Sequence, residues 1–317
     1  MIEIQMLQTS LEHLYQVCNN VIMFEGIILG VAQGITEWLP ISSKGMLLLV
    51  QTNFFHEKSI TDGIELALFL HLGTFLAALW YFRKDVLDVL RVLFEVRRER
   101  PFFIISWHIF HRKEQKHNKE VVALVRFLVV ATFVSGVVGF TLLEIVLAYT
   151  DEYLKAHLQS STQIITAMVG FLLIGTGMLQ LRARKRKSRD GGKGIDQLSM
   201  GDAWLLGILQ GLAALPGFSR SGFTVSGLLL RGFGDIAALR VSFLMSLPAV
   251  LGGNILLSAR DFTITPVALW GLLGSFIFGL LTIHLLLKTA QKLNFAWFVV
   301  GFGGLLLIAA AAQLFVL

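Results

Sequence analysis

The sequence contains little charge, little proline and a single cysteine. Charged residues occupy 15% of its 317 positions, against about 25% in a typical soluble domain, which argues against an ordinary cytosolic enzyme. The one cysteine, Cys18, excludes a disulfide framework and a cysteine-based zinc site. Hydrophobic residues instead make up 55% of the chain, and its mean hydropathy is +0.71. One soluble core cannot bury that much apolar surface, so the composition excludes disorder and a coiled coil and predicts a chain surrounded by lipid.

Apolar stretches long enough to cross roughly 30 Å of hydrocarbon occur six times. They lie at 64–82, 121–149, 163–181, 241–258, 264–287 and 295–317. Two further stretches, 24–50 and 203–230, are apolar but are interrupted near the middle by Pro, Gly, Ser and a cation. Each contains a G-x-x-x-G pair that is expected to permit close helix packing. Residues 1–23 precede them as an N-terminal extension, for which a short amphipathic helix and a loosely attached segment are both compatible with the sequence.

Positive charge is concentrated in four of the connections between these stretches. Of the 27 Lys and Arg residues, 21 lie in 83–120, 182–202, 231–240 and 288–292. Positively charged loops lie on the cytoplasmic side of membrane proteins, so we expect these connections in the cytoplasm and both termini outside. Because 203–230 then begins and ends on the cytoplasmic side, it is predicted to be a re-entrant hairpin, and 24–50 a second one that enters from outside. The basic run at 182–189 is interpreted as an anchor that attracts anionic lipid, not nucleic acid.

The two interrupted stretches share residues at a constant spacing. Matching residues 177 positions apart are Gln33-Gly34 with Gln210-Gly211, Ser42 with Ser219, and Gly45 with Gly222. Each half of the chain is therefore one hairpin followed by three spans, in opposite orientations, as in many secondary transporters. The sequence predicts an all-α integral membrane protein with six transmembrane helices and two re-entrant helical hairpins in an inverted-topology repeat. The repeats are 24–181 and 203–317, joined by the cytoplasmic loop 182–202.

Polar and ionisable residues gather in the two hairpins, although their burial at membrane depth is costly. They are Gln33, Glu37, Ser42, Ser43 and Lys44 in the first hairpin, and Ser219, Arg220, Ser221 and Thr224 in the second. Hydroxyls, cations and accessible backbone N–H groups are the parts of an anion or phosphate site, and an arginine can bind two phosphate oxygens at once. The alternative interpretation is a buried pair of Glu37 and Arg220 that only fixes the packing of the hairpins.

These motifs resemble those of a known family, the undecaprenyl-diphosphatases or bacitracin-resistance phosphatases. The matching segments are QGITEWLPISSKG, LPGFSRSGFTVSG and, at 71–85, HLGTFLAALWYFRKD. The resemblance implies a multi-pass enzyme of the bacterial plasma membrane that hydrolyses a polyprenyl diphosphate to the monophosphate, recycling the lipid carrier of peptidoglycan synthesis. It also implies a divalent cation, Mg²⁺ or Ca²⁺. No nucleic-acid partner is expected, and the sequence does not decide whether the chain forms a homodimer.

The resemblance also implies roles for individual residues. Glu37 is implied as a base or metal ligand, Ser43 as the nucleophile or the group that orients it, and Arg220 as a phosphate clamp. Substrate binding is implied for Gln33, Ser42, Ser219, Ser221 and Thr224, and Lys44 is predicted to join them because its charge favours phosphate. One position departs from the family pattern, since Met46 stands where a His is common, and Met cannot transfer a proton. His71 is the candidate to replace that His in catalysis, and a purely structural His71 is the alternative.

Two further residues bear on the implied metal. Gln33 cannot supply the charge that a Glu would, so a metal site here has one anionic ligand fewer. Lys44 is unusual between Ser43 and Gly45, and its charge favours phosphate but disfavours a metal beside it.

A second function is compatible with the same residues. The inverted repeat and the missing His favour a flippase or transporter of polyprenyl phosphate that has no hydrolytic activity. In that case Glu37, Lys44 and Arg220 would bind a headgroup that crosses the membrane. Phosphate release from a polyprenyl diphosphate separates the two hypotheses, because fold-level analogy alone cannot.

Overall fold

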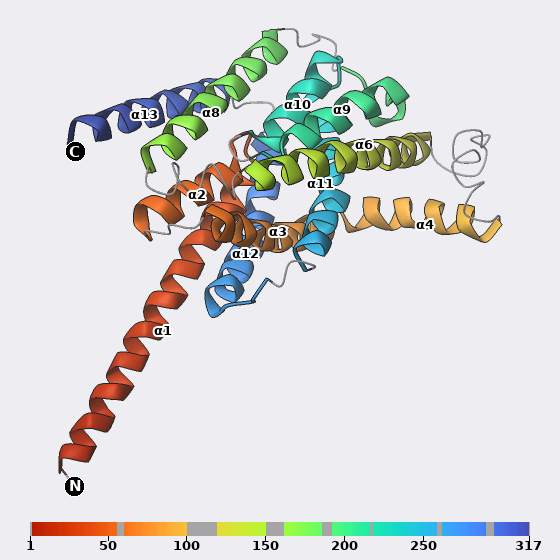
Figure 1. The fold of residues 1–317 in the computed structure, drawn as a ribbon. Helices are drawn as coiled ribbons and strands as arrows, with labels where there is room; N and C mark the ends of the chain where they lie inside the picture. Colours follow the sequence, from red (N-terminus) through yellow and green to blue (C-terminus); the bar gives the residue numbers. More distant parts are fainter. Residues whose placement is uncertain are drawn as a thin grey trace.

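Helices form nearly all of the regular structure. The computed structural model describes residues 2–55, 60–99, 119–149, 162–185, 192–215, 218–258, 262–289 and 295–316. Within these ranges the only other regular features are a short 3-10 turn, Ile195–Gln197, and one isolated bridge between Lys193 and Phe233. The predicted all-α class is therefore confirmed (Figure 1). The helices are α1 (Ile2–Thr36), α2 (Ser43–Phe54), α3 (Ile60–Tyr81), α4 (Arg83–Glu99), α6 (Lys119–Tyr149), α8 (Thr162–Lys185), α9 (Met200–Leu212), α10 (Arg220–Leu230), α11 (Asp235–Ser258), α12 (Pro266–Thr289) and α13 (Phe295–Val316).

Five of the described helices are long and apolar enough to cross a membrane. They are α3, α6, α8, α11 and α12, and each coincides with a predicted span. The sixth predicted span, 295–317, is α13, whose described apolar part, Ala296–Ala312, is shorter than the other five. The described part of the chain is thus helical, with five helices typical of a multi-pass membrane protein, and the sixth crossing stays a prediction.

Both interrupted stretches fold as two helices separated by a short break. The first consists of α1 and α2, and the second of α9 and α10. A serine precedes the second helix of each pair, Ser42 before α2 and Ser219 before α10. Its hydroxyl accepts a hydrogen bond from a backbone N–H three residues later, which is the geometry of an N-cap. The matching serines of the two halves therefore begin equivalent helices.

The second hairpin returns to the side from which it starts. Asp202, in the first turn of α9, accepts a hydrogen bond at 2.6 Å from Nε of Arg231, the residue that follows α10. Burial would raise the pKa of Asp202, but hydrogen bonds from Ser199 and Arg231 hold it below its ordinary value. This contact agrees with the predicted hairpin. The placement of either hairpin within a membrane stays a prediction.

Two helices extend beyond the predicted elements. α1 begins at Ile2, so the N-terminal extension and the first arm of the hairpin are one continuous helix, which projects away from the other helices in Figure 1. α4 occupies the start of the connection 83–120, which the charge pattern identifies only as a basic connection. This helix is amphipathic, and its Val92 packs against Val125 of α6. The rest of that connection lies outside the described residues.

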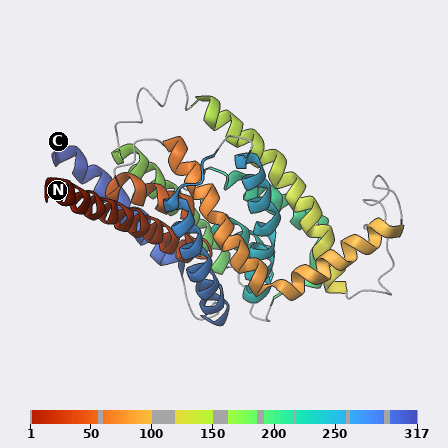
Figure 2. The same cartoon turned by 90° about the horizontal axis from the view of Figure 1, so that it is seen from below.

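The two halves interlock, because each hairpin packs against a span of the other half. α1 lies along α12, and α9 lies along α6, as the two views of Figures 1 and 2 show. Glycines allow these approaches. A Cβ on Gly34 of α1 would lie 2.7 Å from the backbone nitrogen of Gly279, and a Cβ on Gly207 of α9 would lie 2.7 Å from Cβ of Val134. The predicted close packing at the G-x-x-x-G pairs is confirmed.

Gly30→Ala is expected to destabilise the contact between α1 and α12. The added Cβ would overlap the carbonyl oxygen of Gly271 and lie 2.9 Å from Cα of Gly274. Both are backbone atoms, so no side-chain rotation can relieve the overlap. Overpacking of this kind costs roughly 1–3 kcal/mol, or about 2–10 °C in melting temperature for a chain of this size. The matched control is Gly175→Ala in α8, where nothing lies within 4 Å of the new Cβ. Equal melting temperatures of the two variants in detergent would contradict the prediction.

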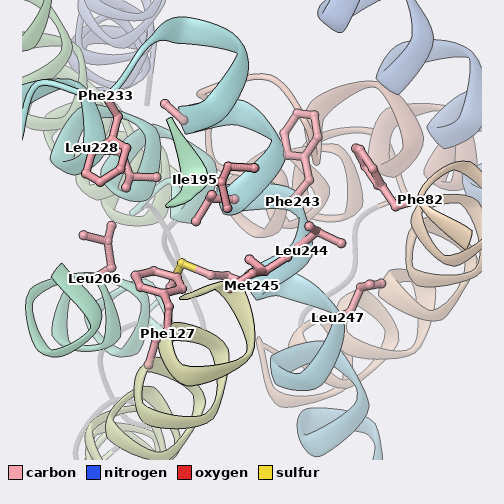
Figure 3. Packing of buried hydrophobic residues seen from close by; sticks show 14 of the residues in the cluster. Phe82, Phe127, Ile195, Leu206, Leu228, Phe233, Phe243, Leu244, Met245 and Leu247 are labelled. Carbon is pink, nitrogen blue, oxygen red and sulfur yellow. The ribbon is translucent and has the colours of Figure 1, made fainter. Parts of the chain in front are cut away.

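The largest buried apolar cluster lies around α11, where the two halves meet. Its members come from both halves and include residues of α3, α6, α9, α10 and α12 (Figure 3). Phe243 of α11 packs near Phe82, with ring centroids 6.2 Å apart. Trp38, in the break of the first hairpin, meets Phe243 edge-on with centroids 4.9 Å apart. These ring contacts fix the first break against the second half of the chain.

Candidate active site

The breaks of the two hairpins lie against each other and exchange hydrogen bonds. Ser221 of α10 donates from Oγ to the carbonyl oxygen of Leu39 at 2.7 Å. In the other direction, Lys44 of α2 donates from Nζ to the carbonyl oxygen of Ala214 at 3.2 Å. Carbonyl groups at helix ends have no partner within their helix, so each hairpin satisfies backbone groups of the other. The two halves of the predicted site are therefore in direct contact.

Glu37 lies at the centre of this contact. Its Oε1 accepts a hydrogen bond from Nη2 of Arg220 at 2.5 Å. Its Oε2 accepts from Oγ of Ser43 at 2.7 Å and from Nε2 of Gln33 at 3.1 Å, and Nε2 of His71 lies 3.1 Å from the same oxygen. Glu37 is only 6% exposed, so these groups, not water, stabilise the carboxylate. The structure thus brings together all four predicted catalytic residues, from α2, α3, α10 and the first break.

Arg220 is held from three directions. Besides Glu37, its Nη1 donates to the carbonyl oxygen of Ser242 at 3.0 Å, and its guanidinium carbon lies 5.7 Å from the centroid of the Trp38 ring. A cation over an indole face is attracted by the ring quadrupole. The pair of Glu37 and Arg220 that the alternative interpretation requires is therefore present. Its role depends on whether a ligand can reach it.

A cavity of about 460 Å³ lies beside this pair. Its charged or titratable lining residues are Glu37, Lys44, His71 and Arg220. Much of the remaining wall is apolar and comes from α3, α6 and α11, with Leu68, Phe140 and Leu256 among its residues. A pocket with charged groups beside apolar walls suits a ligand that has an anionic headgroup and a hydrocarbon chain.

The predicted substrate-binding residues divide into two groups. Ser42, Lys44 and Ser221 line the cavity, whereas Gln33, Ser219 and Thr224 are not among its described lining residues. Ser219 donates to the carbonyl oxygen of Ile41 at 3.0 Å, and Oγ1 of Thr224 lies 2.6 Å from Oγ of Ser242. In this structure these side chains support the residues that line the cavity. Direct contact of all six with a substrate stays a prediction.

The positions of His71 and Met46 bear on the departure from the family pattern. His71 is 6% exposed and lines the cavity. Its Nδ1 lies 2.5 Å from the carbonyl oxygen of Ala67 in the same helix, which leaves Nε2 directed at Glu37. Met46 is not among the described lining residues and packs against the apolar cluster that includes Val169 and Val299. His71 therefore faces the cavity beside Glu37 and Met46 does not, and a catalytic role for His71 stays a prediction.

Three residues at the site carry no clear signal in the sequence. Trp38 contacts Arg220 through its indole ring, and Ser242 accepts a hydrogen bond from it through a backbone carbonyl. Other aromatic residues have such a ring face and every residue has a carbonyl, so the sequence does not mark these two positions. Gln210 lines the cavity, and its Nε2 donates to the carbonyl oxygen of Met245 at 3.3 Å. Its match with Gln33 in the repeat is the one signal that could have identified it as a site residue.

The residues at this site do not fit a resident divalent cation. Mg²⁺ and Ca²⁺ prefer carboxylate, carbonyl and water oxygens. Glu37 is the one carboxylate among the described lining residues, and both of its oxygens already accept hydrogen bonds. Lys44 and Arg220 place two positive charges in the same cavity. No group of three His, Cys, Asp or Glu side chains in the described ranges could hold a metal ion, so no catalytic step is derived through one.

Known proteins match the chain over most of its length. Residues 26–305 match the family model described as bacitracin resistance protein BacA. The undecaprenyl-diphosphatase of Methanococcoides burtonii is 42% identical over 282 residues, which are 88% of this chain and 95% of that protein. The undecaprenyl-diphosphatase of Haloarcula marismortui is 37% identical over 287 residues, 88% of this chain and 94% of that protein. That of Alkaliphilus metalliredigens is 30% identical over 284 residues, 87% and 93% respectively. The family expected from the hairpin motifs is thereby confirmed.

Proposed function

Because the chain belongs to the BacA family of bacitracin resistance proteins, we propose that it hydrolyses undecaprenyl diphosphate to the monophosphate and phosphate. The observation that carries this proposal is the contact of Glu37 with Ser43, His71 and Arg220 beside a cavity with apolar walls. The names of the relatives agree with the phosphatase that the motifs predict. They give no support to a transporter without hydrolytic activity.

The cavity accounts for both parts of such a substrate. The diphosphate would lie beside Lys44 and Arg220, and the prenyl chain would follow the apolar walls of α3, α6 and α11. Phosphoryl transfer requires little covalent help from the protein, so catalysis consists mainly of positioning and charge stabilisation. Fixed donors inside a site shielded from water are well suited to that task.

The contacts of Glu37 suggest how its neighbours divide the reaction. Ser43 already donates to Glu37, so Glu37 can accept a proton as Ser43 attacks the terminal phosphorus or orients a water that does so. Arg220 binds phosphate oxygens and stabilises the charge of the transition state. His71, through Nε2, would protonate the oxygen of the leaving monophosphate. Ser42 and Ser221 lie in the same lining and would donate to the phosphate oxygens.

The biological role follows from the product. We propose that the monophosphate returns to use as a lipid carrier for cell-wall polymers, which in a bacterium is peptidoglycan synthesis. The relatives from Methanococcoides burtonii and Haloarcula marismortui are archaeal, so family membership supports a multi-pass membrane location and does not specify the bacterial plasma membrane.

The proposal is tested by phosphate release from undecaprenyl diphosphate. Protein purified in detergent is expected to release one phosphate for each lipid monophosphate formed. The Glu37→Gln variant, purified in the same way, controls for a contaminating phosphatase. Tight lipid binding without phosphate release would overturn the proposal and favour the transporter.

His71→Ala is expected to lower turnover by about 100-fold, because positioned general acids and bases typically contribute 10²–10⁴-fold. The matched control is His284→Ala. His284 lies in α12, contacts Tyr81 at 3.5 Å and is not among the residues described as lining the site cavity. Its loss should leave turnover within about twofold of the original protein. If both variants keep full turnover while the melting temperature falls for His71→Ala alone, then His71 is structural.

A further inference from the structure

The charged groups of the cavity carry a net positive charge before any substrate binds. Glu37 contributes one negative charge, and Lys44 and Arg220 contribute two positive charges. Gln33, which donates to Glu37, is neutral. The cavity is therefore electrostatically suited to an anion and unfavourable for an additional cation.

Lys44 lies near Glu37 but forms no direct ion pair with a carboxylate among the described residues. Its Nζ lies 3.4 and 3.2 Å from the carbonyl oxygens of Ala213 and Ala214, and it lines the cavity that contains Arg220. Two carbonyl dipoles orient an ammonium group but do not neutralise it, and a charge without a direct counter-ion in a largely apolar cavity is costly. A phosphate group that entered the cavity would supply the missing negative charge. Lysine is well suited to that role, as a compact cation with three donors.

Gln33 and Lys44 make the net charge of the site two units more positive than that of a site that would suit a divalent cation. With Glu at 33 and an uncharged residue at 44, the site would contain two carboxylates and one arginine. Mg²⁺ is commonly held by one or two carboxylates together with substrate phosphates. Gln33 and Lys44 each raise the charge of the site by one relative to that arrangement. Their combined effect equals the charge of one Mg²⁺ ion.

We propose that the ammonium of Lys44 replaces a divalent cation, so that this chain hydrolyses a lipid diphosphate without a bound metal. The inference rests on the proposed function. In the reaction one water is consumed. Either its oxygen attacks the terminal phosphorus directly and a proton passes to Glu37, or Oγ of Ser43 attacks first, gives its proton to Glu37, and is then displaced from the phosphorus by the water. The bond from the terminal phosphorus to the bridging oxygen breaks, and its electron pair stays on the lipid monophosphate. Lys44 and Arg220 stabilise that charge until Nε2 of His71 protonates the oxygen, and the proton held by Glu37, 3.1 Å away, then restores His71 or passes to solvent.

The first test is turnover on undecaprenyl diphosphate after dialysis against EDTA, with EDTA in the assay. The original protein is expected to keep its turnover within about twofold, and added Mg²⁺ is expected to raise it by no more than twofold. Lys44→Ser should lose at least about 30-fold in EDTA, whereas Lys44→Arg, which keeps the charge, should lose less than tenfold. The matched control is Lys288→Ser near the end of α12, an exposed lysine that is not among the described cavity residues. It should behave as the original protein does.

If the inference is correct, a double variant that reverses both charge differences should make turnover depend on a divalent cation. Gln33→Glu combined with Lys44→Ser is expected to be inactive in EDTA and to regain at least tenfold turnover with Mg²⁺. Calorimetry gives a readout apart from activity. Methylene diphosphonate should bind the original protein in EDTA and bind Lys44→Ser at least tenfold more weakly. Mg²⁺ alone should bind only the double variant.

The outcomes separate this inference from the proposed function. Loss of more than tenfold turnover in EDTA by the original protein, restored by Mg²⁺, would overturn the inference and leave the phosphatase intact. Absence of phosphate release with and without Mg²⁺ would overturn the proposed function. In that event the calorimetry still decides the inference, because diphosphonate that binds only with Mg²⁺ would refute it. Melting temperatures of all variants show whether a loss reflects misfolding, in which case Lys44→Arg decides.

Discussion

Glu37→Gln is expected to lower turnover on undecaprenyl diphosphate by about 1,000-fold or more. Both oxygens of the Glu37 carboxylate face donors, with Arg220 at 2.5 Å from Oε1 and Ser43 at 2.7 Å from Oε2. An amide places an NH₂ group against one of these donors, whichever way it is turned, and it cannot accept a proton. General-base catalysis alone typically contributes 10²–10⁴-fold, and the loss of an oriented Ser43 adds to it.

The matched control is Glu120→Gln, which removes a carboxylate of another ion pair. Glu120 bonds Arg240 at 2.9 Å where α6 and α11 begin, and neither residue is among those described as lining the cavity. Turnover should stay within about twofold. Removing one member of a buried pair costs roughly 3–5 kcal/mol, so the melting temperature of each variant is measured in the same detergent. A folded Glu37→Gln protein with turnover within tenfold of the original would refute the central role of Glu37.

Arg220→Lys is expected to lower turnover by about 100-fold in a protein that still folds and inserts, and Arg220→Ala is expected to lower it further. Lysine keeps the charge but loses the planar fork that matches two phosphate oxygens. One preorganised donor to transition-state charge is typically worth roughly 100- to 1,000-fold in rate. Arg220 already pairs with Glu37 at 2.5 Å without a substrate. A large loss of turnover in Arg220→Lys would therefore show that Arg220 does more than maintain this pair.

The competing interpretation predicts a different result for the same variant. If Arg220 only fixes the hairpins by pairing with Glu37, then Lys should preserve much of the function, and turnover within about threefold of the original would establish that role. Arg240→Lys is the control for a paired, partly exposed guanidinium outside the cavity, since Arg240 pairs with Asp85 and Glu120. This variant should lower the melting temperature but leave turnover within about twofold of the original.

The distribution of apolar and charged residues was sufficient to predict the five apolar spans. The predicted stretch at 264–287, for example, is α12 at Pro266–Thr289. Such spans are predictable because the thickness of the hydrocarbon layer sets the length of the apolar run that crosses it. The hairpin breaks were equally predictable, since Pro, Gly and a capping serine act locally. The sequence analysis does not identify α4, because its apolar stripe alternates with nine charged residues, five cations and four acids, so that its average composition resembles a polar loop.

The sequence could indicate which polar residues gather in the two hairpins, but not the geometry in which they meet. A buried arginine requires an anionic partner, for which the sequence offers both Glu37 and a substrate diphosphate. The structure pairs Arg220 with Glu37, although 183 positions separate the two residues. No comparable argument places His71, because a histidine within a span is compatible with many partners. Trp38 and Ser242 act through a ring face and a backbone carbonyl, and their contribution depends on which helix faces meet. Local sequence carries no information about that.

The packing of α1 against α12 has a consequence for the time course of synthesis. About 230 residues separate the end of α1 at Thr36 from the start of α12 at Pro266. At about 5–20 residues per second, the ribosome needs roughly 10–50 s to make the intervening chain. During that interval the glycine face of α1 has no partner from its own chain, and the translocon, lipids or a chaperone must shield it.

The Glu37 carboxylate meets Ser43, Gln33 and His71 first, so the nascent first half can satisfy its buried charge before the ribosome reaches Arg220.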